Sequence, residues 1–269
     1  MLIEPSSRRM SLSPDVEQLP SYSNPPVMEV SFGIAFATTE PVQTRHLGQF
    51  WESACSKYPK TSDALPILDP AELPLKLSAP VPIPLRRVMA YDPANEFVAQ
   101  IQDTRLYLNW RRSDPTQTYP RFPIVKSRFG ELWEGFLGFA ETHGLGQVVA
   151  TRFELTYVNQ IRVGEGGILG AIERYLRPFR FSDVAGLAQA ESVSSTWRFR
   201  MPELAGTGSI ALGNIAGDSG SLNLTVACSA DARSAGSQDQ WFDGAHRWIV
   251  REFTELTTPA GHTEWGREK

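Results

Sequence analysis

Cysteine is scarce in this chain, which contains only Cys55 and Cys228. Neither belongs to a Cys-x-x-Cys motif or to a Cys/His spacing, so the sequence contains no zinc site of the usual kinds. One cysteine falls in an expected helix and the other in an expected strand. We expect both to be reduced, buried thiols, and a disulfide is the less favoured alternative.

Long apolar runs and an excess of positive charge are also missing. No run approaches the roughly 20 residues that span a bilayer, so we expect no membrane segment. Residues 1–26 contain Arg8 and Arg9 without a following apolar stretch, which does not fit a secretory signal and leaves the cytoplasm as the expected compartment. The formal net charge of −4 argues against broad affinity for nucleic acid.

Motifs of the common enzyme classes are absent as well. Ser219 lies in a Gly-Asp-Ser-Gly run between two expected strands, which favours a hairpin turn over a nucleophile. The glycines at 164, 166 and 167 precede a helix without the lysine of a phosphate loop, and we expect a tight turn. Surface or helix-terminal roles are favoured over a metal site for the four dispersed histidines, His46, His143, His246 and His262. We therefore expect neither a cofactor nor a metal.

What the chain does contain is a repeated pattern. The order apolar, Glu, aliphatic, hydroxyl, aromatic occurs at Met28–Phe32 and again at Phe153–Tyr157. Each copy begins an expected series of strand, helix, three strands and helix. The sequence therefore predicts a flexible tail of residues 1–26 followed by two related halves, residues 27–145 and 146–269, that share one sheet.

The first half begins with alternating apolar residues at 28–36, the period of a half-buried strand. A helix follows from Thr44 to Tyr58, where Pro59 stops it. Residues 59–84 carry seven prolines, too many for an internal strand or helix, and predict an irregular connector. Strands at 85–91, 97–102 and 105–112 and a helix at 123–143 complete this half.

The last two of these strands form a hairpin whose register can be tested. A two-residue turn at Asp103-Thr104 places Ile101 opposite Leu106, Ala99 opposite Leu108 and Phe97 opposite Trp110, all on one face. The other face then collects side chains that form hydrogen bonds in several directions: Gln100, Gln102, Tyr107, Asn109 and Arg111.

The second half repeats the order, with strands at 149–163, 188–200, 207–215 and 221–229 and helices at 168–176 and 238–257, the latter capped by Ser237 and Gln240. Asn159 falls on the apolar side of its strand and needs a partner if buried, or marks a bulge. Because each strand has one apolar side, we expect an α+β fold. We expect duplicated βαβββα units to form one antiparallel sheet with helices on one face, as in the saddle of the TATA-binding protein, an analogy that carries no function.

Several segments resemble a family of bacterial and archaeal proteins that is known for sporadic distribution and has no assigned activity. The segments span most of the chain: 26–30, 100–103, 108–112, 119–122, 154–159 and 262–266. The resemblance implies that the polar residues in them are candidates for a shared site. It also suggests an accessory role in a mobile or defence-type gene cluster.

Glu29 and Glu154 occupy equivalent places in the two copies and are expected on the face away from the helices. A pseudo-twofold axis can bring them together, and paired carboxylates bind metals or divide acid and base roles. The alternative, which we favour, is that they pair with arginines or orient a ligand. Candidate arginine partners are Arg111, Arg112, Arg152 and Arg162.

The polar sheet face is the main indication of function in the sequence. We expect a non-catalytic cytoplasmic binding or regulatory protein that holds a partner or a small polar ligand there. A polar face that is only solvated has the same composition and is the alternative interpretation. The sequence also leaves open whether the protein forms a homo-oligomer. The alternative is an enzyme acting on a nucleotide-like substrate through the two carboxylates, whereas nucleic-acid binding by the saddle is disfavoured. The candidate binding residues are Glu29, Gln100, Gln102, Tyr107, Asn109, Arg111 and Glu154.

Overall fold

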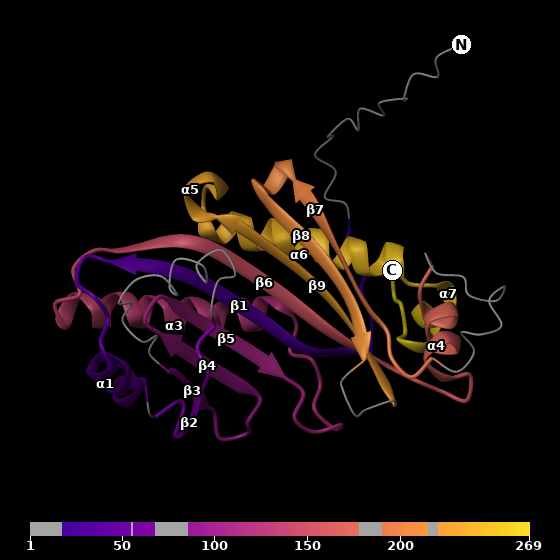
Figure 1. Cartoon of the computed structure of the whole chain (residues 1–269), viewed down its shortest axis with the longest axis horizontal. Coiled ribbons are helices and arrows are strands. Elements are labelled where there is room, and N and C mark those ends of the chain that lie inside the picture. The colour runs from indigo at the N-terminus through magenta and orange to yellow at the C-terminus, as the bar shows by residue number, and fades with distance from the viewer. Residues whose placement is uncertain (1–17, 55, 68–85, 178–189, 215–219) are drawn as a thin grey trace, which may run out of the picture.

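The computed structural model describes residues 18–54, 56–67, 86–177, 190–214 and 220–269. In these residues nine strands form one antiparallel sheet in the order β2-β3-β4-β5-β1-β6-β9-β8-β7. The two longest helices, α3 and α6, lie behind the sheet in the view of Figure 1. The expected α+β class and single antiparallel sheet are confirmed. No helix in the described part of the chain is long and apolar enough to cross a membrane.

The first half differs from expectation in its connector. Residues 60–64 form a strand at the edge of the sheet that the described residues build, and they pair with β3, so the prediction of an irregular segment is wrong for them. Its side chains are almost all exposed, so no alternation of apolar residues marks it in the sequence. The connector from residue 68 onward lies outside the described residues. The elements are β1 (Val27–Thr38), α1 (Thr44–Ala54), β2 (Lys60–Ala64), β3 (Arg87–Tyr91), β4 (Phe97–Gln102), β5 (Arg105–Arg111) and α3 (Phe122–Thr142).

The second half has the expected strands and the two expected helices, α4 and α6, with shifted ends. Its elements are β6 (Val148–Arg162), α4 (Gly167–Tyr175), β7 (Ser194–Met201), the 3-10 turn η2 (Pro202–Leu204), β8 (Gly206–Asn214), β9 (Ser221–Asp231), α5 (Ala232–Ala235), α6 (Gln238–Leu256) and α7 (Pro259–Glu264). Ser237 stands at the N-cap of α6 but its side chain makes no capping hydrogen bond, contrary to expectation. Ser219 and Cys55 lie outside the described residues.

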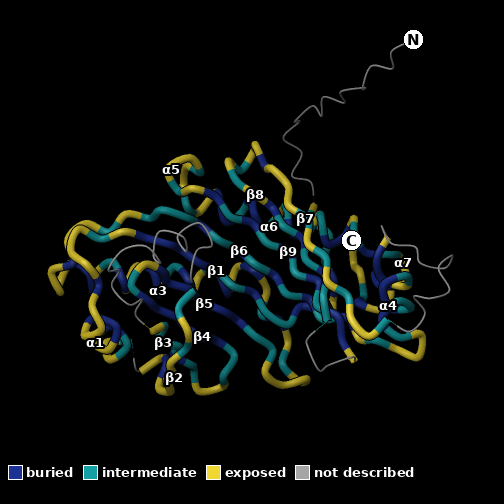
Figure 2. Tube along the Cα trace, in the orientation of Figure 1, coloured by how far each residue is buried: buried dark blue, intermediate teal, exposed yellow. Residues whose placement is uncertain are grey.

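The hairpin of β4 and β5 has the predicted register, with Phe97 opposite Trp110, Ala99 opposite Leu108 and Ile101 opposite Leu106. All six side chains are buried in the core between sheet and helices. The centre of this core is Phe32 on β1. Its ring centroid lies 5.4 Å from that of Phe129 on α3 and 5.1 Å from that of Phe242 on α6, so both helices pack on one residue. Figure 2 shows the resulting buried band along the central strands.

The two halves meet where β1 pairs with β6. Ser31 and Thr156, the fourth residues of the two copies of the repeated pattern, face each other directly. Outward from this pair the strand order is β1-β5-β4-β3 on one side and β6-β9-β8-β7 on the other. In each half, therefore, the first strand pairs with the last strand of the meander that follows it.

Buried polar groups find partners in several places. Asn159 is buried, and its Nδ2 donates to the carbonyl of Leu224 at 3.1 Å, while the β1–β6 register shifts beside it, so both alternatives for this residue hold. Cys228 is a free, buried thiol, as expected. His46 and His262 are buried and lie at helix ends, in the first turn of α1 and the last turn of α7, so the helix-terminal alternative holds for both. Gln43 and Thr257 supply their hydrogen bonds.

Candidate functional site

The polar face of the first half is filled by its own side chains. Gln100, Gln102, Tyr107 and Asn109 have exposed fractions of only 5%, 3%, 8% and 9%, so the expectation of an open face is wrong here. The backbone N–H of Ile67 donates to Gln102 Oε1 at 2.8 Å, and Gln102 Nε2 donates back to the Ile67 carbonyl at 3.1 Å. Arg87 donates to Gln100 Oε1 at 2.7 Å. Both glutamines thus hold neighbouring parts of the chain.

Tyr107 reaches across the sheet because a glycine lies beneath it. Gly33 on β1 pairs with Tyr107 on one side and with Glu154 on the other. A Cβ at Gly33 would lie 2.2 Å from Tyr107 Cε1, so only glycine leaves room for the ring. The tyrosine hydroxyl then donates to Glu154 Oε2 at 2.5 Å. Burial, reinforced by the nearby carboxylate, raises the pKa of Tyr107 well above its ordinary value and keeps this hydroxyl protonated.

The carboxylate of Glu154 also faces two arginines. Its Oε1 lies 3.5 Å from Arg105 Nη1, which is buried, and 3.8 Å from Arg152 Nη1. The arginine-paired alternative therefore holds for Glu154, with Arg152 among the expected partners. Because two cations and a hydroxyl surround this carboxylate, its charge is already compensated within the fold.

Glu29 has a separate set of contacts. Asn109 Nδ2 donates to Glu29 Oε1, and Ser31 Oγ donates to Asn109 Oδ1 at 3.0 Å. Along β1, Glu29 stands four residues before Gly33, the partner of Glu154, which corresponds to about 13 Å. The structure does not bring the two carboxylates together.

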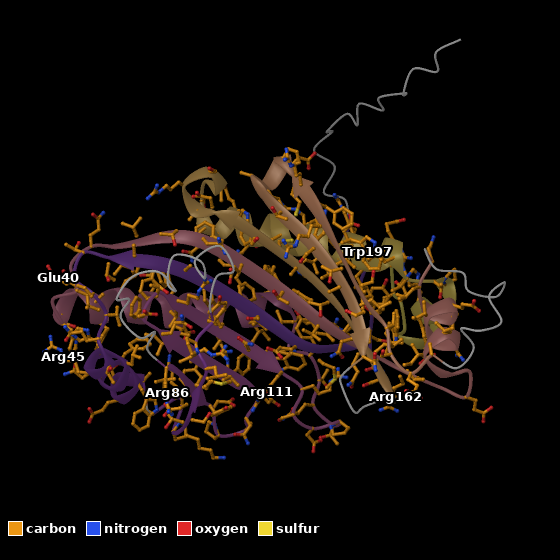
Figure 3. All side chains as sticks on the ribbon, viewed as in Figure 1. Glu40, Arg45, Arg86, Arg111, Arg162 and Trp197 are labelled. Atoms are coloured by element: carbon orange, nitrogen blue, oxygen red, sulfur yellow. The ribbon has the colours of Figure 1, made fainter. Side chains whose placement is uncertain are left out.

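Arg111 lies at the outer end of the filled face (Figure 3). Its Nε donates to the Asn95 carbonyl at 3.3 Å, and its guanidinium lies 5.0 Å from the ring centroid of Tyr91. These contacts tie β5 to the turn before β4 and to β3. Of the seven candidate binding residues, only Tyr107 and Glu154 line the large groove that the sheet does form.

That groove, of about 1030 Å³, lies over the second half of the polar face. We call it the arginine groove. Cross-strand pairing from β6 through β9 and β8 to β7 forms two rows of residues. One row is Thr156, Ala227, Ser209 and Arg198, and the other is Glu154, Ser229, Thr207 and Arg200. Short side chains therefore form a floor between two walls. The floor residues are Ser31, Thr156, Thr207, Ser209, Ala227 and Ser229.

One wall of the groove consists of Arg198 and Arg200 on the edge strand β7. Residues two apart on a strand point to the same face about 7 Å apart, so both guanidinium groups stand along this wall. Both side chains are exposed, and neither forms an ion pair or hydrogen bond with another residue that the structure describes. The opposite wall, with Arg152, Glu154 and Tyr107, lies three strand spacings away, about 14 Å.

The groove presents mainly hydrogen-bond donors. Arg198 and Arg200 donate without accepting, and hydroxyls from Thr156, Ser209 and Ser229 lie between them and the far wall. Asp231 at the rim accepts from the backbone N–H of Arg233, and Glu154 is compensated as described. In a chain with a net charge of −4, this surface therefore carries local positive charge suited to carboxylate or phosphate oxygens.

Sequence reasoning missed Arg198 and Arg200. A signal was present, because Trp197, Phe199 and Met201 alternate with them at the period of a strand. The short residues of β8 and β9 that complete the groove lie in other segments. Only the cross-strand register shows that these segments form its floor.

Comparison with known proteins adds no assignment. No model of a known protein family matches the chain, and no curated protein matches it significantly. The resemblance to the sporadically distributed family therefore stays a prediction. In the part of the chain that the structure describes, no three His, Cys, Asp or Glu side chains gather closely enough to hold a metal ion.

Proposed function

We propose that this protein is a non-catalytic binding or regulatory protein that holds an anionic ligand or partner segment in the arginine groove. The observation that carries the proposal is the pair Arg198 and Arg200, exposed and unpaired with any described residue above a floor of short hydroxyl side chains. Long polar side chains in such a position contribute little to folding. Their placement is explained by recognition of carboxylate or phosphate groups, for which guanidinium geometry is suited.

The enzyme alternative has weaker support. It requires Glu29 and Glu154 to act on one substrate, whereas about 13 Å of strand separates them. Each also has its own partners, Asn109 for Glu29 and Tyr107 with two arginines for Glu154. These contacts favour structural roles for both carboxylates.

An internal duplication accounts for the position of the groove. If the halves are copies, Glu29, Ser31 and Gly33 on β1 correspond to Glu154, Thr156 and Val158 on β6. The residues that pair with them, on β5 in the first half and on β9 in the second, then correspond as well. Large side chains then face small ones at all three places: Tyr107 and Thr225, Asn109 and Ala227, Arg111 and Ser229. The groove lies where the second copy has the smaller residues. Superposing residues 27–142 on 148–256 in an experimental structure tests the duplication, which fails if Glu29 does not fall on Glu154.

The binding proposal is tested with two anionic probes, a fluorescein-labelled hexaglutamate peptide and inorganic tripolyphosphate. Fluorescence anisotropy follows the peptide, and calorimetry follows the phosphate. Since a hydrogen bond to a charged group contributes about 1.5–3 kcal/mol, replacing both Arg198 and Arg200 with alanine should weaken binding at least tenfold. Comparing the two probes shows whether carboxylate or phosphate is preferred.

The matched control is the double variant Arg162→Ala with Arg247→Ala, which removes the same charge at exposed positions outside the groove. It should bind both probes within about twofold of the parent protein at 0.15 M salt, where distant charges are screened. Equal weakening in both double variants would indicate a general charge effect and would refute the groove as the site.

A further inference from the structure

A second cavity lies on the opposite, helix-covered side of the sheet. It has a volume of about 250 Å³ and is lined by β6, the start of α3, α6 and the segment that precedes β1. Tyr157 on β6 points into it, whereas its neighbour Thr156 points into the arginine groove. The two sites are therefore separated by the sheet, and the cavity has no part in the function proposed above.

Most of the cavity wall is apolar, with Val27, Phe122, Ile249 and Phe253 among its side chains. Four polar lining residues, Ser21, Tyr22, Arg121 and Asn159, have hydrogen-bond partners in Glu268, Thr254, the Tyr22 carbonyl and the Leu224 carbonyl respectively. The remaining polar groups form a chain of three. Tyr119 Oη lies 2.9 Å from Tyr157 Oη, which lies 3.0 Å from His246 Nδ1. The His246 ring stacks on Phe122, with centroids 3.9 Å apart and planes at 5°. This stacking fixes the His246 end of the three hydrogen-bonded groups, and Tyr119 forms the other end.

All three groups are uncharged at neutral pH. Burial raises the pKa of both tyrosines and lowers the pKa of His246 to about 4. Hydrogen bonds run either from Tyr119 towards His246 or in the reverse direction, depending on the histidine tautomer. In the first case the Tyr119 hydroxyl retains a free acceptor, and in the second it retains a free donor. No described residue other than Tyr157 bonds to it.

The backbone beside this chain is strained. Arg121 has a φ of 76°, in the left-handed region that a residue with a side chain rarely adopts. This turn directs Tyr119 and Phe122 into the cavity wall from either side of Arg121. Arg121 Nη1 donates to the Tyr22 carbonyl at 2.9 Å and so closes the segment before β1 over the cavity. Strained backbone clusters at binding and active sites, and here it borders the cavity.

We propose that this cavity binds a small, uncharged aromatic molecule with one hydroxyl or carbonyl group, of the size of a substituted phenol. An apolar cavity of roughly 150 Å³ admits benzene, so 250 Å³ accommodates a ring with substituents. The largely apolar wall disfavours a charged ligand, because burying a charge there is costly and the one cation in the described lining, Arg121, already donates to the Tyr22 carbonyl. The hydrogen-bonding position that the Tyr119 hydroxyl leaves unused supplies the polar contact.

The test compares 4-methylphenol with p-xylene, which has a similar size and no hydroxyl, on the full chain. Saturation-transfer NMR titrations should show that 4-methylphenol binds about fivefold more tightly. Tyr119→Phe should abolish this preference without changing the affinity for p-xylene. Equal affinities in the parent protein, or a preference that survives in Tyr119→Phe, would overturn the proposal.

A cavity-filling variant locates the binding. Val250 lines the cavity and is partly exposed, so Val250→Phe should fill the space and reduce binding of both compounds at least tenfold. Val149→Phe adds the same side chain at an exposed position on β6 and should leave both affinities unchanged. If both variants bind like the parent, the compounds lie elsewhere and the proposal fails. Should Val250→Phe not fold, the Tyr119→Phe comparison decides alone.

Discussion

Burial determines the charge of His246 more than the neighbouring charges do. The main cause that lowers the pKa of His246 is its removal from water, and the nearby carboxylate of Asp243 only opposes this in part. The hydroxyl of Tyr157 accordingly has a neutral imidazole as its partner. Protonation of His246 would place a positive charge among Phe122, Tyr157 and the apolar wall, which is unfavourable.

The stability of the fold should therefore depend on pH through His246. Its pKa is 6.5 in the unfolded chain and about 4 in the folded protein, so the unfolded state binds more protons between these values. This contribution to the free energy of unfolding is fully present above pH 6.5 and is lost as the pH falls towards 4. The loss amounts to about 1–2 kcal/mol by pH 5. Urea denaturation of the parent and of His246→Asn at pH 8 and pH 5 measures it.

The loss on acidification should be smaller in His246→Asn than in the parent protein. His143→Asn, at an exposed histidine that follows α3, should retain the parent's pH dependence. Identical acid sensitivity in the parent and in His246→Asn would mean that His246 titrates normally in the folded state.

At the scale of elements, the sequence predicted what local rules determine. The β4–β5 register follows from a two-residue turn and from apolar residues that must share a face, and both are visible in residues 97–110. By contrast, Lys60–Ala64 pairs as an edge strand with no apolar pattern of its own. The arginine groove also escaped prediction. It depends on Arg198 lying opposite Ser209 and Ser209 opposite Ala227, pairings between segments that no local pattern specifies.

The contact between Gly33 on β1 and Tyr107 on β5 supplies a test of the β1–β5 register. Gly33→Ala would place a Cβ 2.2 Å from the Tyr107 ring and should destabilise the protein by about 1–3 kcal/mol in urea denaturation. The ring cannot move freely, because its hydroxyl is held by Glu154.

In a Tyr107→Ser background the same glycine substitution should cost much less, since the ring is gone. The two changes should therefore be strongly non-additive, as expected for residues in contact. Additive effects would show that the cost of Gly33→Ala arises from something other than the Tyr107 ring.

Over the whole molecule, one sheet face has two different characters. Long side chains fill it over the first half and bind one another, whereas short ones leave it hollow over the second half. The sequence correctly located polar residues on this face, and it predicted binding by the residues of the first half, where side chains are densest. Dense polar side chains satisfy one another, so the accessible donors are found where the side chains are sparse.

This contrast predicts opposite effects for two double variants. Asn109→Ala with Arg111→Ala removes the contacts to Glu29, Ser31 and the Asn95 carbonyl, and should lower the melting temperature by several degrees. Its affinity for the hexaglutamate and tripolyphosphate probes should stay within about twofold of the parent. Arg198→Ala with Arg200→Ala should lose affinity at least tenfold with a melting temperature close to that of the parent, because these exposed arginines support no other described residue. The reverse pattern would place the binding site on the first half, where the hydrogen-bonding residues of β4 and β5 had predicted it.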